Sequence, residues 1–121
     1  MPHVPGPQHL KIETSQDGDT AVVRLTGELD LAGEEHLDRT VEDLERNAGR
    51  VVVDLTQITF IDSSGLRALL RLWKRSQLNG HDFAVMGGSE QVRRTMALTG
   101  LDGVLPFAQD GDVLAAPQKS G

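Results

Sequence analysis

Apolar and polar residues alternate near the start of the chain, which is the pattern of a half-buried β-strand. The alternation covers residues 10–13 and returns, with more apolar positions, over residues 21–27. Residues 16–19 lie between the two segments and contain an Asp-Gly pair, which is a strong turn signal. The sequence therefore predicts that the domain opens with a β-hairpin.

The next segment has the spacing of an amphipathic helix. Leu37, Val41 and Leu44 recur at intervals of four and three residues and form one apolar stripe that faces the sheet. Asp30 precedes this stripe as a candidate N-cap, because its carboxylate can accept a hydrogen bond from the first helical turn. Residues 47–49 are expected to end the helix.

Two continuous apolar runs predict strands that are covered on both faces. The first is the β-branched run at residues 51–55, and we expect Phe60 and Ile61 to extend its buried course after a short irregular piece. The second run covers residues 83–86. Residues 104–107 are a candidate short edge strand, a position where proline is tolerated.

A helix is predicted after each of these two runs. The first covers residues 64–77 and stops at Asn79-Gly80, and the second is capped by Ser89 and ends at Gly100. Strands that alternate with helices after an opening hairpin predict an α/β fold with a mixed sheet and helices packed mainly on one face. The apolar positions expected to face inward on the two helices are Leu66, Leu69, Leu70 and Trp73, then Val92 and Met96.

Composition limits the kinds of function that are open to the chain. The 121 residues suit one domain, which we place at residues 9–115 between flexible tails at residues 1–8 and 116–121. The net charge of -6 and the 3% of aromatic residues argue against nucleic-acid binding. The chain has no cysteine, no signal peptide and no apolar run of about 18 residues, so we expect a cytoplasmic protein.

The segment FIDSSGL at residues 60–66 is the strongest candidate for chemistry. It places two hydroxyls at the start of a helix, where free backbone N–H groups and the helix dipole favour negative charge. A phosphate on Ser64 fits that environment, and Gly65 has no side chain to shield the hydroxyl from another protein. The alternative interpretation is that Asp62 or Ser63 only caps the helix. Capping and phosphorylation are compatible.

Three arginines follow Ser64 on the same face of the predicted helix. Arg67, Arg71 and Arg75 lie three, seven and eleven residues after it. They form either an ordinary solvated helix face or a docking face that meets acidic groups of a partner. Arg67 is near enough to steady a phosphate on Ser64.

An enzyme of the serine-hydrolase class does not fit this segment. Its nucleophile elbow needs glycine two places before and two places after the serine, whereas Asp62 and Leu66 flank Ser64 in this way. No pair of histidines has the spacing of a metal-binding helix, and no glycine-rich loop fits a phosphate cradle, so we expect no metal and no cofactor. The histidines, all expected at the surface, are His3, His9, His36 and His81.

A phospho-aspartate receiver is the other small α/β fold that we considered. Asp54 at the end of a buried strand fits it. A receiver, however, opens with a single strand and follows it with clustered acids that hold Mg²⁺. This chain opens with a hairpin, which disfavours that interpretation.

Four segments together resemble a STAS domain of the anti-sigma factor antagonist type. They lie at residues 27–30 (GELD), 54–55 (DL), 60–66 (FIDSSGL) and 99–101 (TGL), and the resemblance spans residues 10–115. The Asp-Ser-Ser-Gly element is its most specific part. The resemblance implies a bacterial partner-switching protein without catalytic activity of its own.

The resemblance also implies a mechanism and a set of site residues. The unphosphorylated protein would bind an anti-sigma factor serine kinase and release the sigma factor, the kinase would phosphorylate Ser64, and a phosphoserine phosphatase would reset the switch. A relative that is not phosphorylated, acting as a scaffold or an accessory subunit, is the alternative, and the oligomeric state stays open. The residues expected to meet the partner are Asp30, Asp62, Ser63, Gly65 and Arg67.

Overall fold

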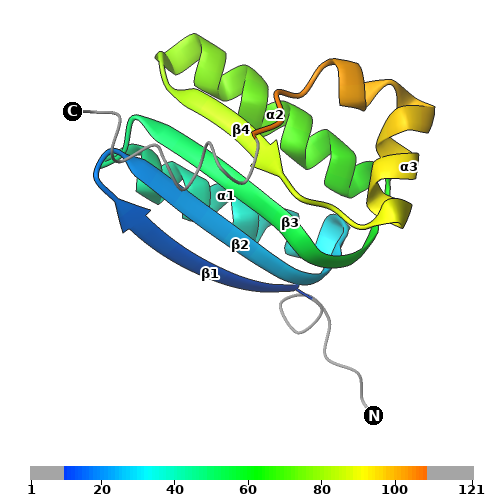
Figure 1. Cartoon of the computed structure of the whole chain (residues 1–121). Coiled ribbons are helices and arrows are strands. Elements are labelled where there is room, and N and C mark those ends of the chain that lie inside the picture. The colour runs from blue at the N-terminus through cyan, green and yellow to red at the C-terminus, as the bar shows by residue number, and fades with distance from the viewer. Residues whose placement is uncertain (1–9, 109–121) are drawn as a thin grey trace.

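A four-stranded β-sheet forms the centre of the computed structural model, which describes residues 10–108 (Figure 1). Three α-helices follow or connect its strands within this range. In chain order the elements are β1 (Leu10–Asp17), β2 (Thr20–Leu29), α1 (Leu31–Glu45), β3 (Arg50–Ile61), α2 (Ser63–Asn79), β4 (Asp82–Met86) and α3 (Glu90–Thr99).

The strands are arranged in the order in which they occur along the chain. β1 and β2 form the expected hairpin and pair antiparallel, and Gly18 adopts a φ of +64° in its turn. β3 and β4 then add to the sheet in parallel, each after a helix that crosses from one strand to the next. The predicted mixed sheet opened by a hairpin is therefore confirmed.

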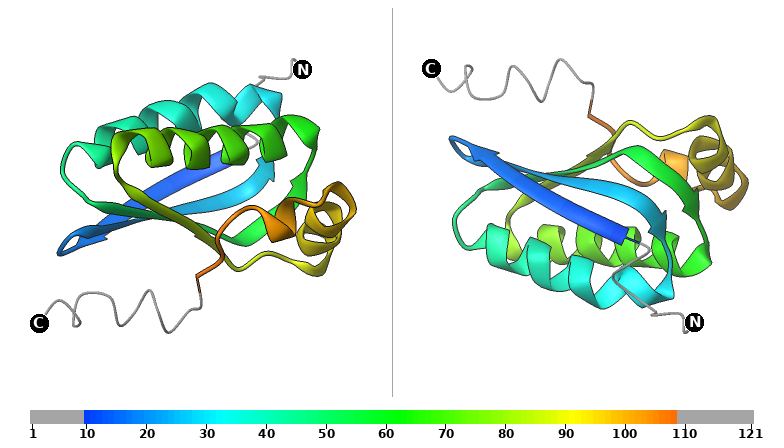
Figure 2. Two further views of the ribbon diagram at one scale, coloured as in Figure 1. Left: turned by 90° about the horizontal axis from the view of Figure 1, so that it is seen from above. Right: turned by 90° about the horizontal axis from the view of Figure 1, so that it is seen from below.

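Helices α1 and α2 lie side by side on one face of the sheet, and α3 is set apart from them (Figure 2). The stripe on α1 is largely as expected, since Leu37 and Val41 are fully buried and Leu44 is partly buried. On α2 the expected stripe is displaced, because Leu72 is fully buried whereas Leu70 and Trp73 are only partly buried.

Most helix ends lie where the sequence predicts them. The side chains of Asp30 and Ser89 cap α1 and α3, and Gly80 ends α2 in the left-handed conformation. α1 ends at Glu45, slightly before the expected residues 47–49. The local signals of capping residues and glycines are therefore sufficient to delimit these helices.

Strand β3 differs from the sequence prediction in its second half. It is continuous, and after residue 55 its buried side chains come at every third position instead of every second. Leu55, Ile58 and Ile61 are buried, whereas Phe60 is 43% exposed. The expectation of a buried Phe60 was wrong, because Phe60 lies on the face of β3 opposite to Leu55 and Ile61, whose side chains join the hydrophobic core.

The segment at residues 104–107 is not a strand. A short 3-10 helix (Leu101–Gly103) precedes it, and only Phe107 forms a bridge, pairing in parallel with Val85 at the edge of β4. Val85 N donates to the Pro106 carbonyl over 2.9 Å, while Pro106 itself has no N–H to donate. This segment therefore meets the sheet edge at Val85, which bonds to Pro106 and to Ala108 on either side of Phe107. The predicted tails, at residues 1–8 and 116–121, lie outside the described residues.

Candidate functional site

The N-termini of α1 and α2 meet at one edge of the sheet. β2 and β3 are parallel neighbours, and their last residues, Leu29 and Ile61, are paired in the ladder. Asp62 N also donates to the Leu29 carbonyl over 3.4 Å. Because each strand leads directly into a helix, this pairing brings Asp30 and Asp62 to the same edge.

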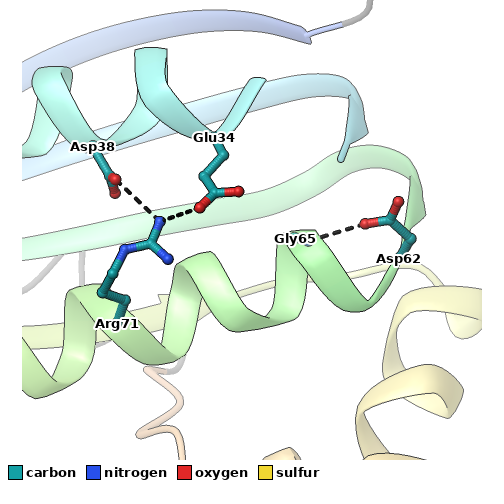
Figure 3. A network of polar contacts seen from close by, with 5 residues as sticks. All are labelled: Glu34, Asp38, Asp62, Gly65 and Arg71. Carbon is teal, nitrogen blue, oxygen red and sulfur yellow. Dashed lines mark hydrogen bonds and ion pairs between the residues drawn. The ribbon is translucent and has the colours of Figure 1, made fainter. Parts of the chain in front are cut away.

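Asp62 is the residue that caps α2. Its backbone is extended, and its Oδ1 accepts a hydrogen bond from Gly65 N over 3.0 Å (Figure 3). Asp30 caps α1 in a similar way, with its Oδ1 accepting from Ala32 N over 3.1 Å. Of the two capping alternatives in the sequence, the structure therefore selects Asp62 and leaves Ser63 as the first helical residue.

Ser63 and Ser64 are the first two residues of a 17-residue helix. Ser63 is exposed and Ser64 is half-buried. No acceptor among the described residues takes the N–H group of either serine. The positive end of the helix dipole and these free donors make the surroundings of the two hydroxyls favourable for an anion.

Gly65 packs tightly against the end of β2. A Cβ at this position would collide with the backbone carbonyl of Leu29 and would lie 2.8 Å from Cγ1 of Ile61. Gly65 is accordingly buried. The missing side chain makes room for the sheet and not, as expected from the sequence, for an approaching protein.

Arg71 and Arg75 form ion pairs with carboxylates of α1. Nη2 of Arg71 lies 2.7 Å from Oε2 of Glu34 and 3.0 Å from Oδ2 of Asp38 (Figure 3). Arg75 Nη2 lies 3.4 Å from Oε1 of Glu45, whose side chain is only 8% exposed. Neither arginine is therefore a free group on a solvated face, and the expectation that they face a partner or a phosphate needs this correction.

The charge of Arg71 is well stabilised where it lies. Partial burial tends to lower the pKa of Arg71, but the nearby carboxylates of Asp38 and Glu34 outweigh this effect and hold the pKa above its ordinary value. Arg67 lies one helical turn closer to Ser64, is exposed, and forms no ion pair with any of residues 10–108. It is the arginine of this set that stays available beside the two serines.

The sequence pattern of the STAS domain family matches residues 11–112 of the chain. The chain belongs to the STAS domain family. Among curated proteins, the anti-sigma F factor antagonist of Paenibacillus polymyxa is 29% identical over 101 residues, which cover 82% of this chain and 86% of that protein.

Solved structures show the same STAS fold. The crystal structure of an anti-sigma factor antagonist from Mycobacterium paratuberculosis matches with a TM-score of 0.78 at 24% identity, covering 95% of this chain and 99% of that one. Unphosphorylated SpoIIAA, an anti-sigma factor antagonist, matches with a TM-score of 0.71 at 20% identity, over 91% of this chain and 96% of that one. The phosphorylated form of Bacillus SpoIIAA matches at 0.64 and 19% identity, over 88% and 97%.

Two apolar side chains beside the motif of this STAS domain were not among the predicted site residues. Leu31, the first residue of α1, is 69% exposed, and Phe60, two residues before the Asp62 cap, is 43% exposed. Leu31 follows a predicted N-cap and lies outside the apolar stripe of its helix, a signal that the sequence does contain. For Phe60 the signal is the alternation along β3, in which residues 51, 53, 55 and 61 face the core and residue 60 lies on the other face.

The described part of this STAS domain has no cluster of metal-ligating side chains and no helix that could span a membrane. No three histidine, aspartate or glutamate side chains within residues 10–108 gather where they could share a metal ion. None of the helices in this range is long and apolar enough to cross a membrane.

Proposed function

We propose that this STAS protein is an anti-sigma factor antagonist that is switched by phosphorylation of Ser64. In the unphosphorylated state it binds an anti-sigma factor, and the sigma factor is released. The names of its curated relatives support the antagonist role. The main support for the switch is the position of Ser64. This residue is half-buried, is the second residue of α2 after the Asp62 cap, and lies among free N–H groups.

The modification itself is a phosphoryl transfer from ATP. The anti-sigma factor acts as a serine kinase, so Oγ of Ser64 attacks the γ-phosphorus, ADP leaves and the hydroxyl proton is released. A phosphoserine phosphatase later hydrolyses the ester with water and regenerates the hydroxyl. This protein is the substrate in both steps and has no catalytic activity, cofactor or nucleic-acid contact of its own, and we place it in the cytoplasm.

The partner surface in this proposal surrounds Ser64 at the meeting point of the two helix N-termini. A phosphate dianion added at the centre of this surface must lose its hydration when the interface closes. Any acidic group of the partner also repels the phosphate. The exposed Leu31 and Phe60 add apolar area that an unmodified interface can bury. The residues assigned to this surface are Asp30, Leu31, Phe60, Asp62, Ser63 and Arg67.

The test begins by capturing the kinase with the wild-type chain from native cells. With that kinase and Mg-ATP, the wild type gains one phosphate on Ser64, Ser64→Ala gains none, and the matched control Ser63→Ala still gains one. Mass spectrometry of the modified peptides locates the phosphate. A phosphate on Ser63 or on a threonine, or capture of a transport complex in place of a kinase, contradicts the proposal.

Binding is measured separately from modification. Ser64→Ala retains affinity for the anti-sigma factor to within about tenfold, because the hydroxyl contributes at most one hydrogen bond of about 0.5–1.5 kcal/mol. Ser64→Asp binds more weakly because it carries a charge. Equal loss of affinity in the two variants shows that charge is not the switch.

A further inference from the structure

Just after its centre, strand β3 has one more residue than the segment of β2 that pairs with it. Arg24 of β2 pairs with Asp54, but the next regular pair joins Thr26 to Gln57. β2 advances by two residues between these pairs, whereas β3 advances by three. The extra residue forms a β-bulge, which bends the strand and changes the direction of the side chains after it.

A second irregularity follows within a few residues. Gly27 pairs with Ile58, and the following residue of β2, Glu28, pairs with Phe60. Thr59 is skipped in the ladder, and its hydroxyl donates to the Gly27 carbonyl over 3.1 Å. Gly27 has a φ of +108°, a backbone conformation that residues with a Cβ rarely adopt. Each irregularity exchanges the inward and outward positions of β3, so after Leu55 the core positions are Ile58 and Ile61, and Phe60 points outward.

The Asp54 side chain stabilises the first bulge through two polar contacts. Its Oδ1 accepts the N–H of Thr56 over 2.9 Å, and its Oδ2 lies 3.4 Å from Nε of Arg24. The Asp54 carboxylate is 8% exposed, so its hydrogen bond with Thr56 N is shielded from bulk water, whereas the Arg24 side chain is 46% exposed. On the other side, Thr56 lies against Gly87, where a Cβ would come within 2.9 Å of the Thr56 backbone nitrogen. The bulge is therefore held by Asp54 on one side and by the start of the β4–α3 loop on the other.

We propose that Asp54 is a positioning residue for Ser64. It acts through the first β-bulge of β3, which its side chain stabilises. The bulge determines which residue of β3 reaches Leu29, and therefore where the Asp62 turn and the start of α2 lie. Without the extra residue β3 shifts by one position along β2, and a shift of one residue exchanges the two faces of a strand. The inference rests on the proposed function, in which Ser64 is the phosphoacceptor.

The variants separate the hydrogen bond from the charge. Asp54→Ala removes the acceptor of the Thr56 N–H and the partner of Arg24. Asp54→Asn keeps an acceptor oxygen and removes only the charge. Glu13→Ala is the matched control, because it removes a carboxylate that pairs with Lys11 over 3.7 Å on β1, a strand without a bulge.

The first measurement uses the isotope-labelled free chain and requires no kinase. In Asp54→Ala the backbone amide signals of residues 61–65 shift together with that of Thr56. They stay in place in Asp54→Asn and in Glu13→Ala. If the signals of residues 61–65 do not move in Asp54→Ala, Asp54 stabilises only its own strand and the proposal is overturned. If Asp54→Ala does not fold, Asp54→Leu replaces it, because leucine also removes the acceptor of the Thr56 N–H while filling the buried space, with the same signals expected to move and the same result overturning the proposal.

The second measurement is the rate of phosphorylation by the captured kinase, at a temperature at which circular dichroism shows every variant folded. We expect kcat to fall about tenfold or more in Asp54→Ala and to change less than about twofold in the other two variants, because small displacements of a reacting group are costly. A loss of stability alone leaves kcat unchanged under these conditions. Unchanged kcat in Asp54→Ala overturns the positioning role, whereas absence of phosphate on the wild type contradicts the proposed function and leaves the amide signals to decide the role of Asp54.

Discussion

At the scale of single residues, Gly65 has the strictest requirement in the motif. The Leu29 carbonyl, which a Cβ on Gly65 would strike, also accepts a hydrogen bond from Asp62 N. A backbone carbonyl held in this way cannot move aside as the end of a long side chain can. The start of α2 therefore approaches β2 closely only because residue 65 is glycine.

Gly65→Ala is expected to lower the free energy of unfolding by about 1–3 kcal/mol, because the added methyl group forces the helix away from the sheet. Gly103→Ala is the matched control, since a Cβ at Gly103 meets no atom within 4 Å. We expect that variant to stay within about 0.5 kcal/mol of the wild type. Urea unfolding measures both, and equal midpoints for the two variants would mean that α2 adjusts freely at its N-terminus.

At the scale of whole elements, the contact between α1 and α2 depends on charge as well as on apolar packing. Arg71 from α2 lies between two carboxylates from α1, Glu34 and Asp38. If the arginine is lost, these two acids remain close together and partly buried without a cation. The contact joins the two helices whose first residues carry the proposed partner surface.

Arg71→Met tests this contact while keeping much of the apolar stem of the side chain. We expect a loss of about 1 kcal/mol in the free energy of unfolding at low salt, with a smaller loss in 1 M NaCl, where charges are screened. Arg39→Met is the control, because Arg39 pairs with Glu35 within α1 and both side chains are more than 70% exposed. Its expected loss is at most about 0.5 kcal/mol, and an equal loss in both variants would contradict a special role for Arg71.

The elements that the sequence predicts are those with local signals. The opening hairpin has a turn pair and an alternating pattern, and the Asp30 cap and the glycine stop at Gly80 each act on their own helix. The burial of Ile58 and the partners of the α2 arginines were not predictable in this way. Ile58 faces the core because of the shifted register between β2 and β3, and Arg71 depends on which acids of α1 lie across from it.

The same distinction applies to the candidate site. The DSSG element identified the segment, and either Asp62 or Ser63 was open as its cap. The choice between them depends on the entry angle of the helix, which the ladder between β2 and β3 determines through the pairing of Leu29 with Ile61. The inward direction of Gly65 has the same origin. The chemistry of the segment could therefore be predicted from the sequence, but the orientation of its residues could not.

At the scale of the whole molecule, phosphorylation of Ser64 is expected to change affinity without changing the fold. The phosphate adds about -1.5 to -2 charges at pH 7, and a negative charge at a helix N-terminus is stabilising by roughly 0.3–1 kcal/mol. The isolated protein should therefore melt at the same or a slightly higher temperature. Binding to the anti-sigma factor should weaken about a hundredfold, which corresponds to about 2.7 kcal/mol.

Thermal melting and titration calorimetry on both forms measure these two effects. Ser64→Ala treated with kinase and Mg-ATP is the control for the handling of the sample. A large fall in melting temperature on phosphorylation, or a loss of far-ultraviolet dichroism, would show that the switch works by unfolding the domain.

The agreement between strand order and chain order has a consequence for biosynthesis. A ribosome releases the chain from its N-terminus, and folding domains can form structure in that order. Each strand of this sheet, as it emerges, meets a neighbour that is already available, and no finished pairing must open to admit a later one. Ser64 follows directly on the third strand, so the residue that we assign to the switch leaves the ribosome only after the edge that positions it.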